Sequence, residues 1–221
     1  PNLSSDITIF RLNFADDDSK GYTLSASGAA ALTLLSTNST PAASLAFRSE
    51  NTNGTNTVTA DLKLGGGAGT TQYFYQVGIG TMQLDGDISE SGASTVLSLG
   101  GGANAVYKIS GNNTFSGGVV IPTSTLKVNI NSATAFGTGA LTINSSGGDV
   151  FDNVSGSPLT LANALNLDSG TTAFFFTGTS DLTFSGVVTF NGCNHAIRVN
   201  GGTLTFSGAV GEDASPRSLI K

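Results

Sequence analysis

A short peptide that recurs at a regular spacing constrains this 221-residue chain more than any other feature. The tetrapeptide Thr-Phe-Ser-Gly occurs at 114–117, 183–186 and 205–208. The second and third copies start about 22 residues apart, and the first copy lies about three such intervals before the second. A period of this length indicates a repeat protein in which each unit packs on its neighbours.

Short alternating segments fill the sequence around these copies. In 125–130 (TLKVNI), 140–144 (ALTIN) and 158–162 (PLTLA), apolar residues alternate with polar ones. A period of two predicts half-buried strands. Gly, Asn, Asp and Ser separate the segments, and these residues suit tight corners because they reach conformations with positive φ.

Strand length and repeat length together predict the fold class. A unit of about 22 residues is too short for a propeller blade of about 40 to 45 residues, but it fits one coil of a parallel β-helix. We therefore predict an all-β solenoid of roughly ten coils of about 22 residues, stacked about 4.8 Å apart. A sandwich or barrel is the alternative, with strands every 8–12 residues or so joined by hairpins. The repeat favours the β-helix.

The composition excludes several other classes of protein. Nine Lys and Arg against fifteen Asp and Glu cannot easily supply the cationic face of a nucleic-acid-binding domain. The long amphipathic runs of a helical bundle are absent. A single cysteine excludes a disulfide-stapled miniprotein. Hydrophobic residues make up 38% of the chain, which is enough for a core and disfavours disorder.

Other features favour an exported protein. Avoidance of cysteine suits an oxidising compartment. The most apolar cluster, Phe174–Phe176, is far shorter than the roughly 18 apolar residues of a membrane span. The chain begins with Pro1 and carries no signal peptide, so we interpret it as a mature piece or a fragment of a longer polypeptide.

One segment resembles a known family. Residues 109–121 (ISGNNTFSGGVVI), followed by 125–128 (TLKV), are similar to the passenger-associated repeat of autotransporters, approximately L-x-G-x-N-T-[YF]-S-G-G-T-x-I…G-x-L-x-V. The central N-T-F-S-G-G is intact, whereas 122–125 (PTST) stands where the family usually places a Gly-containing turn. Residues 10–14 and 21–25 resemble the coils that commonly precede such repeats, and residues 36–80 are the least typical.

The resemblance implies a right-handed parallel β-helix that is exported across the cell envelope as part of a long surface protein. It also implies that the repeat serves secretion and stacking, while binding activities lie in other segments. We expect a single β-helix segment over residues 1–221, with less regular coils at 1–100 and regular passenger-type repeats at 101–221. The residues expected to matter are architectural: Asn113, Thr114, Phe115, Ser116, Gly117, Gly118, Leu182, Phe184, Gly186, Leu204, Phe206 and Gly208.

Acidic residues raise the alternative of a polysaccharide lyase or hydrolase on this fold. Hydrolysis needs two or three converging carboxylates, and a lyase needs Ca²⁺ on acidic ligands together with a basic residue. Asp16–Asp18 with Lys20 can form such a centre, and Asp85 and Asp87 can supply a carboxylate pair. Consecutive acids point in different directions, so we interpret Asp16–Asp18 as a solvated turn between two coils. We interpret Asp85 and Asp87 as a polar turn. We expect no enzymatic activity, catalytic residue or cofactor, and leave open a cation at Asp16–Asp18.

Two further patterns have simple interpretations. Cys193 and His195 form a Cys-x-His pair, but two ligands are too few for a structural zinc site, and a nucleophilic pair needs orienting partners. We interpret both as loop or core positions. The glycine runs at 65–69 and 100–104 lack the Lys-Ser/Thr of a phosphate loop, and we interpret them as coil corners.

Two aromatic triplets, Tyr73–Tyr75 and Phe174–Phe176, are the best pointer to an interaction surface. Alternation turns at least one ring of each triplet outward, where it can stack on a sugar or pack against another rod. The alternative is that loops cover these rings. Three functions are therefore considered: a structural rod, a polysaccharide-active enzyme and a non-catalytic glycan-binding module.

The leading prediction is a structural or adhesive stalk segment of an exported bacterial surface protein. Its partners are other copies of itself or further coils of the same polypeptide, which would make fibres, and surface glycans. We expect no nucleic-acid partner and no transmembrane segment in this chain. The expected location is extracellular, at the outer membrane of the bacterial cell surface.

Overall fold

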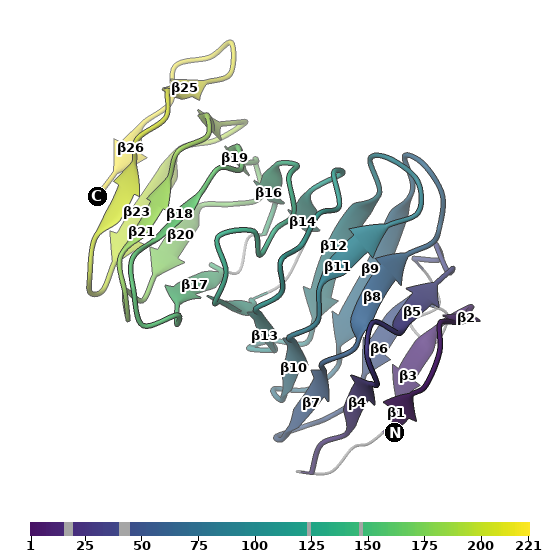
Figure 1. Cartoon of the computed structure of the whole chain (residues 1–221). Helices are drawn as coiled ribbons and strands as arrows, with labels where there is room; N and C mark the ends of the chain where they lie inside the picture. The colour runs from purple at the N-terminus through teal and green to yellow at the C-terminus, as the bar shows by residue number, and fades with distance from the viewer. Residues whose placement is uncertain (16–19, 40–44, 123–124, 146–147) are drawn as a thin grey trace.

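The computed structural model describes residues 1–15, 20–39, 45–122, 125–145 and 148–221. In these residues the chain forms strands and corners without a helix, and parallel strands stack as a β-solenoid of about nine turns (Figure 1). The predicted all-β parallel β-helix is confirmed, with about nine turns in place of ten. Its handedness stays a prediction.

Two long sheets run the length of the solenoid, and every paired strand lies parallel to its neighbours. The ten-stranded sheet contains β1 (Asn2–Leu3), β4 (Thr23–Ala26), β7 (Thr55–Val58), β10 (Thr81–Leu84), β13 (Val106–Ile109), β15 (Lys127–Ile130), β17 (Val150–Asn153), β20 (Ala173–Phe176), β23 (His195–Val199) and β26 (Leu219–Ile220). The nine-stranded sheet contains β3 (Leu12–Phe14), β6 (Phe47–Ser49), β9 (Thr71–Gln76), β12 (Val96–Gly101), β14 (Val119–Ile121), β16 (Leu141–Ile143), β19 (Leu165–Leu167), β22 (Val188–Phe190) and β25 (Val210–Glu212).

A third face of the solenoid is interrupted. Its first sheet contains β2 (Ile7–Ile9), β5 (Ala31–Leu34), β8 (Asp61–Leu64) and β11 (Ile88–Glu90), and its second contains β18 (Leu159–Leu161), β21 (Leu182–Phe184) and β24 (Leu204–Phe206). The two turns that begin with β13 and β15 have no strand on this face. Figure 1 shows the interruption in the teal and green middle of the solenoid.

Turn length varies along the chain. In the ten-stranded sheet, a short turn brings Lys127 of β15 into register with Val106 of β13, whereas a much longer turn brings Thr57 of β7 into register with Thr23 of β4. Three turns separate the first TFSG copy, which follows β13, from the second, which lies at β21. The wide interval between those two copies in the sequence therefore corresponds to three turns of the solenoid.

Alternate residues of the strands point inward and form one continuous core. Aromatic rings stack along it in two series. Phe14, Phe47 and Phe74 have ring centroids 5.3 Å apart at each step. Phe136, Phe151, Phe174, Phe184 and Phe206 follow at 6.3, 4.9, 6.4 and 6.1 Å. Stacked apolar side chains between turns are what stabilises a solenoid.

No helix long and apolar enough to cross a membrane occurs in the part of the chain that the structure describes.

Candidate functional site

The segment that resembles the autotransporter repeat lies on the interrupted third face, and its asparagine bonds to two other turns. Asn113 is buried, and its Oδ1 accepts the backbone N–H of Ile88 at 2.7 Å. The Asn113 side-chain amide donates to the carbonyl of Ala135 at 2.8 Å. One side chain therefore links the turns before and after its own, on a face where no strand ladder can do so.

The neighbouring residues alternate between core and surface. Phe115 is buried in the core, whereas Thr114 and Ser116 are exposed. The Ser116 hydroxyl donates to Glu90 Oε1 at 2.6 Å and accepts the backbone N–H of Ser94 at 2.8 Å. The exposed members of the motif thus also bond to the preceding turn.

The two glycines of the motif lie where a side chain has no room. A Cβ on Gly117 would lie 2.3 Å from the backbone of Thr95. Gly118 has φ of 78°, and a Cβ there would lie 2.1 Å from the carbonyl oxygen of Ala140. Close stacking of turns and a left-handed conformation together require glycine at position 118.

The two later copies lie directly on each other. Leu182 pairs with Leu204 and Phe184 with Phe206 in the register of β21 and β24. Leu182 and Phe184 are fully buried, whereas Leu204 and Phe206 are only half-buried because they lie in the last strand of this face. Gly186 and Gly208 repeat the role of Gly117, since a Cβ on either would lie within 2.4 Å of backbone atoms of the turn beneath.

Aspartates on the third face form a bonding series that the sequence analysis missed. The Oδ1 atom of Asp6 accepts the backbone N–H of Ala31 at 3.0 Å, that of Asp61 accepts from Asp87, and that of Asp87 accepts from Asn112. Asp181 accepts from Thr203 in the same way. Each acceptor immediately precedes an apolar residue of a third-face strand, and this Asp-apolar pattern is the signal that could have revealed the series.

This series explains one of the two predicted acidic groups. Asp87 accepts a bond from the next turn, and Asp85 accepts the side-chain amide of Gln83 at 2.6 Å, both at the corner before β11. These bonds fit the predicted polar turn. Asp16–Asp18 lie outside the described residues, and Lys20 lies at their edge. Within the described ranges, no group of three or more His, Cys, Asp or Glu side chains is placed to hold a metal ion.

Cys193 and His195 come together at the start of β23, where His195 is buried in the core and Cys193 is half-buried. The His195 ring is fully buried, and its Nδ1 lies 2.5 Å from the carbonyl oxygen of Thr171. Its Nε2 lies 3.2 Å from the carbonyl oxygen of Asn191 and 3.9 Å from Cys193 Sγ. The ring also stacks on Phe190 with centroids 5.4 Å apart. The histidine therefore fixes the backbone of neighbouring turns from a core position.

One buried carboxyl group differs from the others. Asp149 is only 2% exposed, and its Oδ1 accepts the backbone N–H of Leu126 at 2.7 Å. Its Oδ2 is buried without a hydrogen-bond partner among the described residues. Burial raises the pKa of Asp149 to about 6, against the lowering effect of the Leu126 and Ser145 hydrogen bonds.

The glycine runs lie mainly at corners, as predicted. Residues 65–69 connect β8 to β9, with φ of 99° at Gly67 and 68° at Gly69. Gly100 and Gly101 end β12, and the corner continues to Asn104, where φ is 65°.

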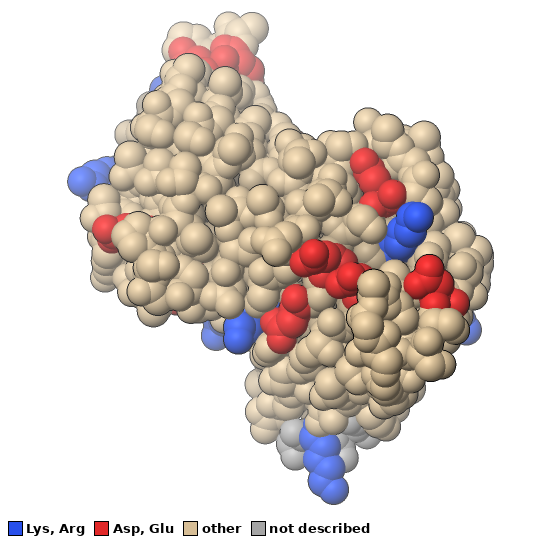
Figure 2. Space-filling model, viewed as in Figure 1, with Lys and Arg blue, Asp and Glu red and all other residues tan. Residues whose placement is uncertain are grey.

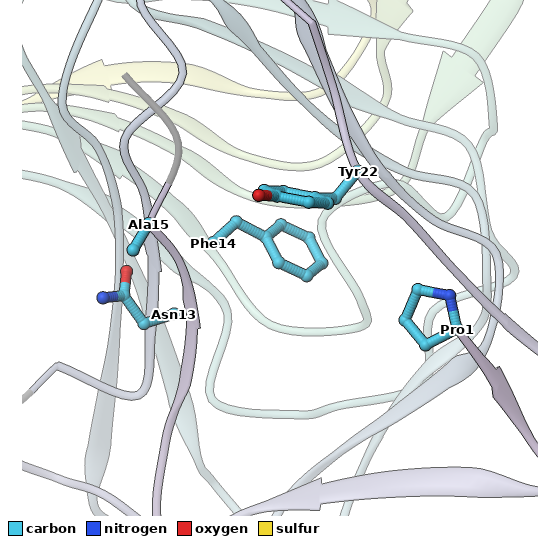
Figure 3. A pocket seen from close by; sticks show the side chains of 5 residues that line it. All are labelled: Pro1, Asn13, Phe14, Ala15 and Tyr22. Atoms are coloured by element: carbon cyan, nitrogen blue, oxygen red, sulfur yellow. The ribbon is translucent and has the colours of Figure 1, made fainter. Parts of the chain in front are cut away.

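Among the described residues, a hollow lies at each end of the solenoid. At the N-terminal end, a hollow of about 390 Å³ is lined by Pro1, Asn13, Phe14, Ala15 and Tyr22, with the Phe14 and Tyr22 rings beside each other (Figure 3). At the C-terminal end, Phe190, Val210 and Leu219 line one hollow, and Leu204 and Phe206 line another. Phe14 and Phe206 are the outermost rings of the two aromatic stacks, so hollows at both ends open onto the core.

Comparison with known proteins gives no relative. No protein-family model matches the sequence, no curated protein matches it, and no solved structure matches it.

Proposed function

We propose that this chain is a structural stalk segment of an exported bacterial surface protein. In this proposal it lies outside the cell, has no enzymatic activity, and acts by extending a rod. The resemblance of residues 109–121 and 125–128 to the autotransporter repeat supports export and surface location. The observation that carries the structural role is the use of the polar side chains: the motif residues and the Asp series all bond one turn to the next.

The surface supports a role by shape more than by charge. Figure 2 shows that most of the visible face is uncharged and that its acidic side chains lie in several separate places. Neighbouring turns place equivalent residues about 4.8 Å apart, so unbroken rows of one charge would repel. Backbone N–H groups bonded to each Asp of the series offset that repulsion.

The two ends of the solenoid support stacking with further coils or with other copies of the chain. Among the described residues, β1, β3, β25 and β26 each pair with one neighbour only, so their outer edges are available to another strand. Leu219 and Ile220 in β26 are 53% and 57% exposed. Free strand edges beside apolar side chains favour end-to-end association.

Electron microscopy of the purified chain at near-physiological salt tests this role. A single chain of nine turns at about 4.8 Å each should form a rod about 45 Å long. End-to-end association predicts longer rods. Ile220→Lys should shorten them, because it places a charge at the exposed edge. Ile79→Lys is the matched control, since Ile79 is 60% exposed at a corner on the side of the solenoid. Single rods of uniform length at every concentration would contradict self-association.

Surface location needs a separate test. An antibody against the chain should label intact source cells, and added protease should remove the label without lysis. Labelling only after lysis would contradict export.

A further inference from the structure

The outer face of the nine-stranded sheet carries two tyrosines on one strand. In β9 the burial alternates, so Gln72, Phe74 and Gln76 face the core, whereas Tyr73 and Tyr75 face outward and are partly exposed. Residues two apart on a strand lie about 6.6 Å from each other. The two tyrosine side chains therefore leave the strand on the same outer face of the sheet.

The neighbouring strand β12 leaves room for the Tyr75 ring at Gly100. Gly100 is the register partner of Tyr75, and a Cβ on Gly100 would lie 3.0 Å from Cδ2 and 3.4 Å from Cε2 of that ring. Ser98, the register partner of Tyr73, points outward between two buried leucines yet is only 4% exposed. Side chains therefore cover the small residues of β12, and the Tyr75 ring leans over it.

Polar groups border the rings on the other side. Arg48 of β6 is the register partner of Tyr75 and forms an ion pair with Glu50. The side-chain amide of Asn13 donates to Glu50 Oε1 at 3.3 Å. The border thus offers donors and acceptors, while the charges of Arg48 and Glu50 offset each other.

We propose that Tyr73 and Tyr75, with Asn13, Arg48 and Glu50 at their border, bind a neutral glycan chain. The apolar C–H face of a sugar ring packs on an aromatic ring face, and its hydroxyl groups both donate and accept hydrogen bonds. A border without net charge favours neutral sugars over polyanionic ones. A protein partner would have to desolvate the Arg48–Glu50 pair, whereas sugar hydroxyls can replace the water around it.

The second triplet does not offer an equivalent surface. Phe175 also points outward, but the Arg198 guanidinium lies over its ring at 5.4 Å from the centroid. Gly148 lies against the same ring, since a Cβ there would be 2.6 Å from Cε2. Phe175 therefore contacts groups of its own chain, and the glycan is assigned to β9 alone.

Binding of neutral hexaoses to the whole chain tests the proposal. Cellohexaose, laminarihexaose and chitohexaose are titrated separately by calorimetry, and saturation-transfer NMR reports which sugar protons contact the rings. We expect at least one hexaose to bind, and the double variant Tyr73→Ala/Tyr75→Ala to weaken it at least tenfold. Tyr75→Phe should retain affinity within about threefold, since it keeps the ring face.

Two further variants separate ring geometry from general disturbance. Gly100→Ala keeps both tyrosines but pushes a methyl group against the Tyr75 ring, so it should weaken binding several-fold. Thr142→Ala, on the same outer face in β16, should leave binding unchanged. The proposal is overturned if no hexaose binds at millimolar concentration or if the double alanine variant binds as the parent does. It is also overturned if the double alanine variant still binds the hexaose but no longer self-associates. In that case the outer face of β9 would be a contact between copies of the chain. Repeating the titration in the Ile220→Lys background, where the rods should be single, makes failure of binding distinct from failure of end-to-end stacking.

Discussion

The N-terminal half of the solenoid (residues 1–100) and the C-terminal half (residues 101–221) differ in the side chains that fill the interior. In β9 of the N-terminal half, two buried glutamines flank Phe74: Gln72 donates to the carbonyls of Leu34 and Ser36 at 2.7 and 3.1 Å, and Gln76 donates to that of Asn51 at 2.6 Å. In the C-terminal half, the inward positions of β20 are Phe174 and Phe176. Buried polar side chains there lie at corners or at strand ends, as Asn163 and His195 do.

The difference coincides with turn length. The carbonyls that the two glutamines bond, those of Leu34, Ser36 and Asn51, all belong to the long turn between β4 and β7. Glutamine amides reach those carbonyls from the strand. The shorter turns that follow β13 leave inward strand positions to rings that stack on the next turn. Both halves thus carry an aromatic stack, and the glutamines of β9 add bonds to carbonyls of the long turn beside Phe74.

The largest expected effect is loss of a ring from the aromatic stack. Phe184 is fully buried between Phe174 and Phe206, so Phe184→Ala should lower the free energy of unfolding by about 3–5 kcal/mol. Phe206 is half-buried at the end of the stack, so Phe206→Ala should cost about 1–2 kcal/mol. Urea unfolding monitored by circular dichroism measures both. Equal losses would mean that Phe206 is covered in solution.

The second effect tests the interrupted middle, where the two halves meet. Gly118→Ala combines a positive φ with a contact at 2.1 Å to the Ala140 carbonyl, and should cost roughly 2–5 kcal/mol. Gly156→Ala is the matched control, because φ is 81° there but no atom lies within 4 Å of the added Cβ. The control should cost about 1–2 kcal/mol in the same urea assay. Similar costs for both would show that the turns separate easily at this point.

Much of the fold could be predicted because the sequence shows two periods, one of two residues within strands and one of about 22 residues between turns. Alternation of two residues marks segments such as 125–130, and the TFSG copies mark the turn. The stacking of Leu182 on Leu204 and of Phe184 on Phe206 follows from aligning those copies. Handedness leaves no trace in either period.

The polar interior could not be predicted in the same way. Gln72 and Gln76 look like surface residues until the longest turn is known to bring carbonyls toward them. The Asp series needed the register of the third face, because Asp61 and Asp87 become neighbours only when the turns that carry them are stacked. Alternation in the sequence predicted that the triplet turns a ring outward. The position of the Tyr75 ring beside Gly100 could not be predicted, because it depends on β12 lying next to β9.

A third test concerns the N-terminal half alone. Gln72→Leu keeps the approximate volume of the side chain but leaves the carbonyls of Leu34 and Ser36 without this donor, and should cost about 2–3 kcal/mol. The substitution also removes the buried Oε1, which has no partner among the described residues. The free energy of unfolding from urea titration decides the balance. A more stable variant would show that the buried amide of Gln72 destabilises the fold and that an apolar side chain is preferred at this position.

A fourth test concerns the polar exception in the C-terminal half. Because the folded pKa of Asp149, about 6, lies above its ordinary value of 3.8, the folded state holds the proton more tightly. The contribution of Asp149 to the free energy of unfolding is therefore greatest below about pH 4. It falls by roughly 2 kcal/mol as the pH rises from about 4 to about 6. Asp149→Asn cannot ionise and should remove this part of the fall. Urea unfolding at pH 4, 5, 6 and 7 measures the difference; parallel curves for the two proteins would place an ordinary carboxyl at this site.

The smallest effect concerns Tyr107, which joins the two halves. Its ring is fully buried in β13, and its hydroxyl lies 3.0 Å from the carbonyl oxygen of Phe74 and 2.6 Å from that of Gly100. Burial raises the pKa of Tyr107, so the hydroxyl stays a donor. Tyr107→Phe keeps the ring and removes only the bond to the N-terminal half, at about 1–2 kcal/mol. Hydrogen exchange should then increase first at the amides of β12 and β13, since the junction opens locally. Uniform protection across both halves would mean that apolar packing holds the junction and that the Tyr107 bond adds nothing to cohesion between the halves.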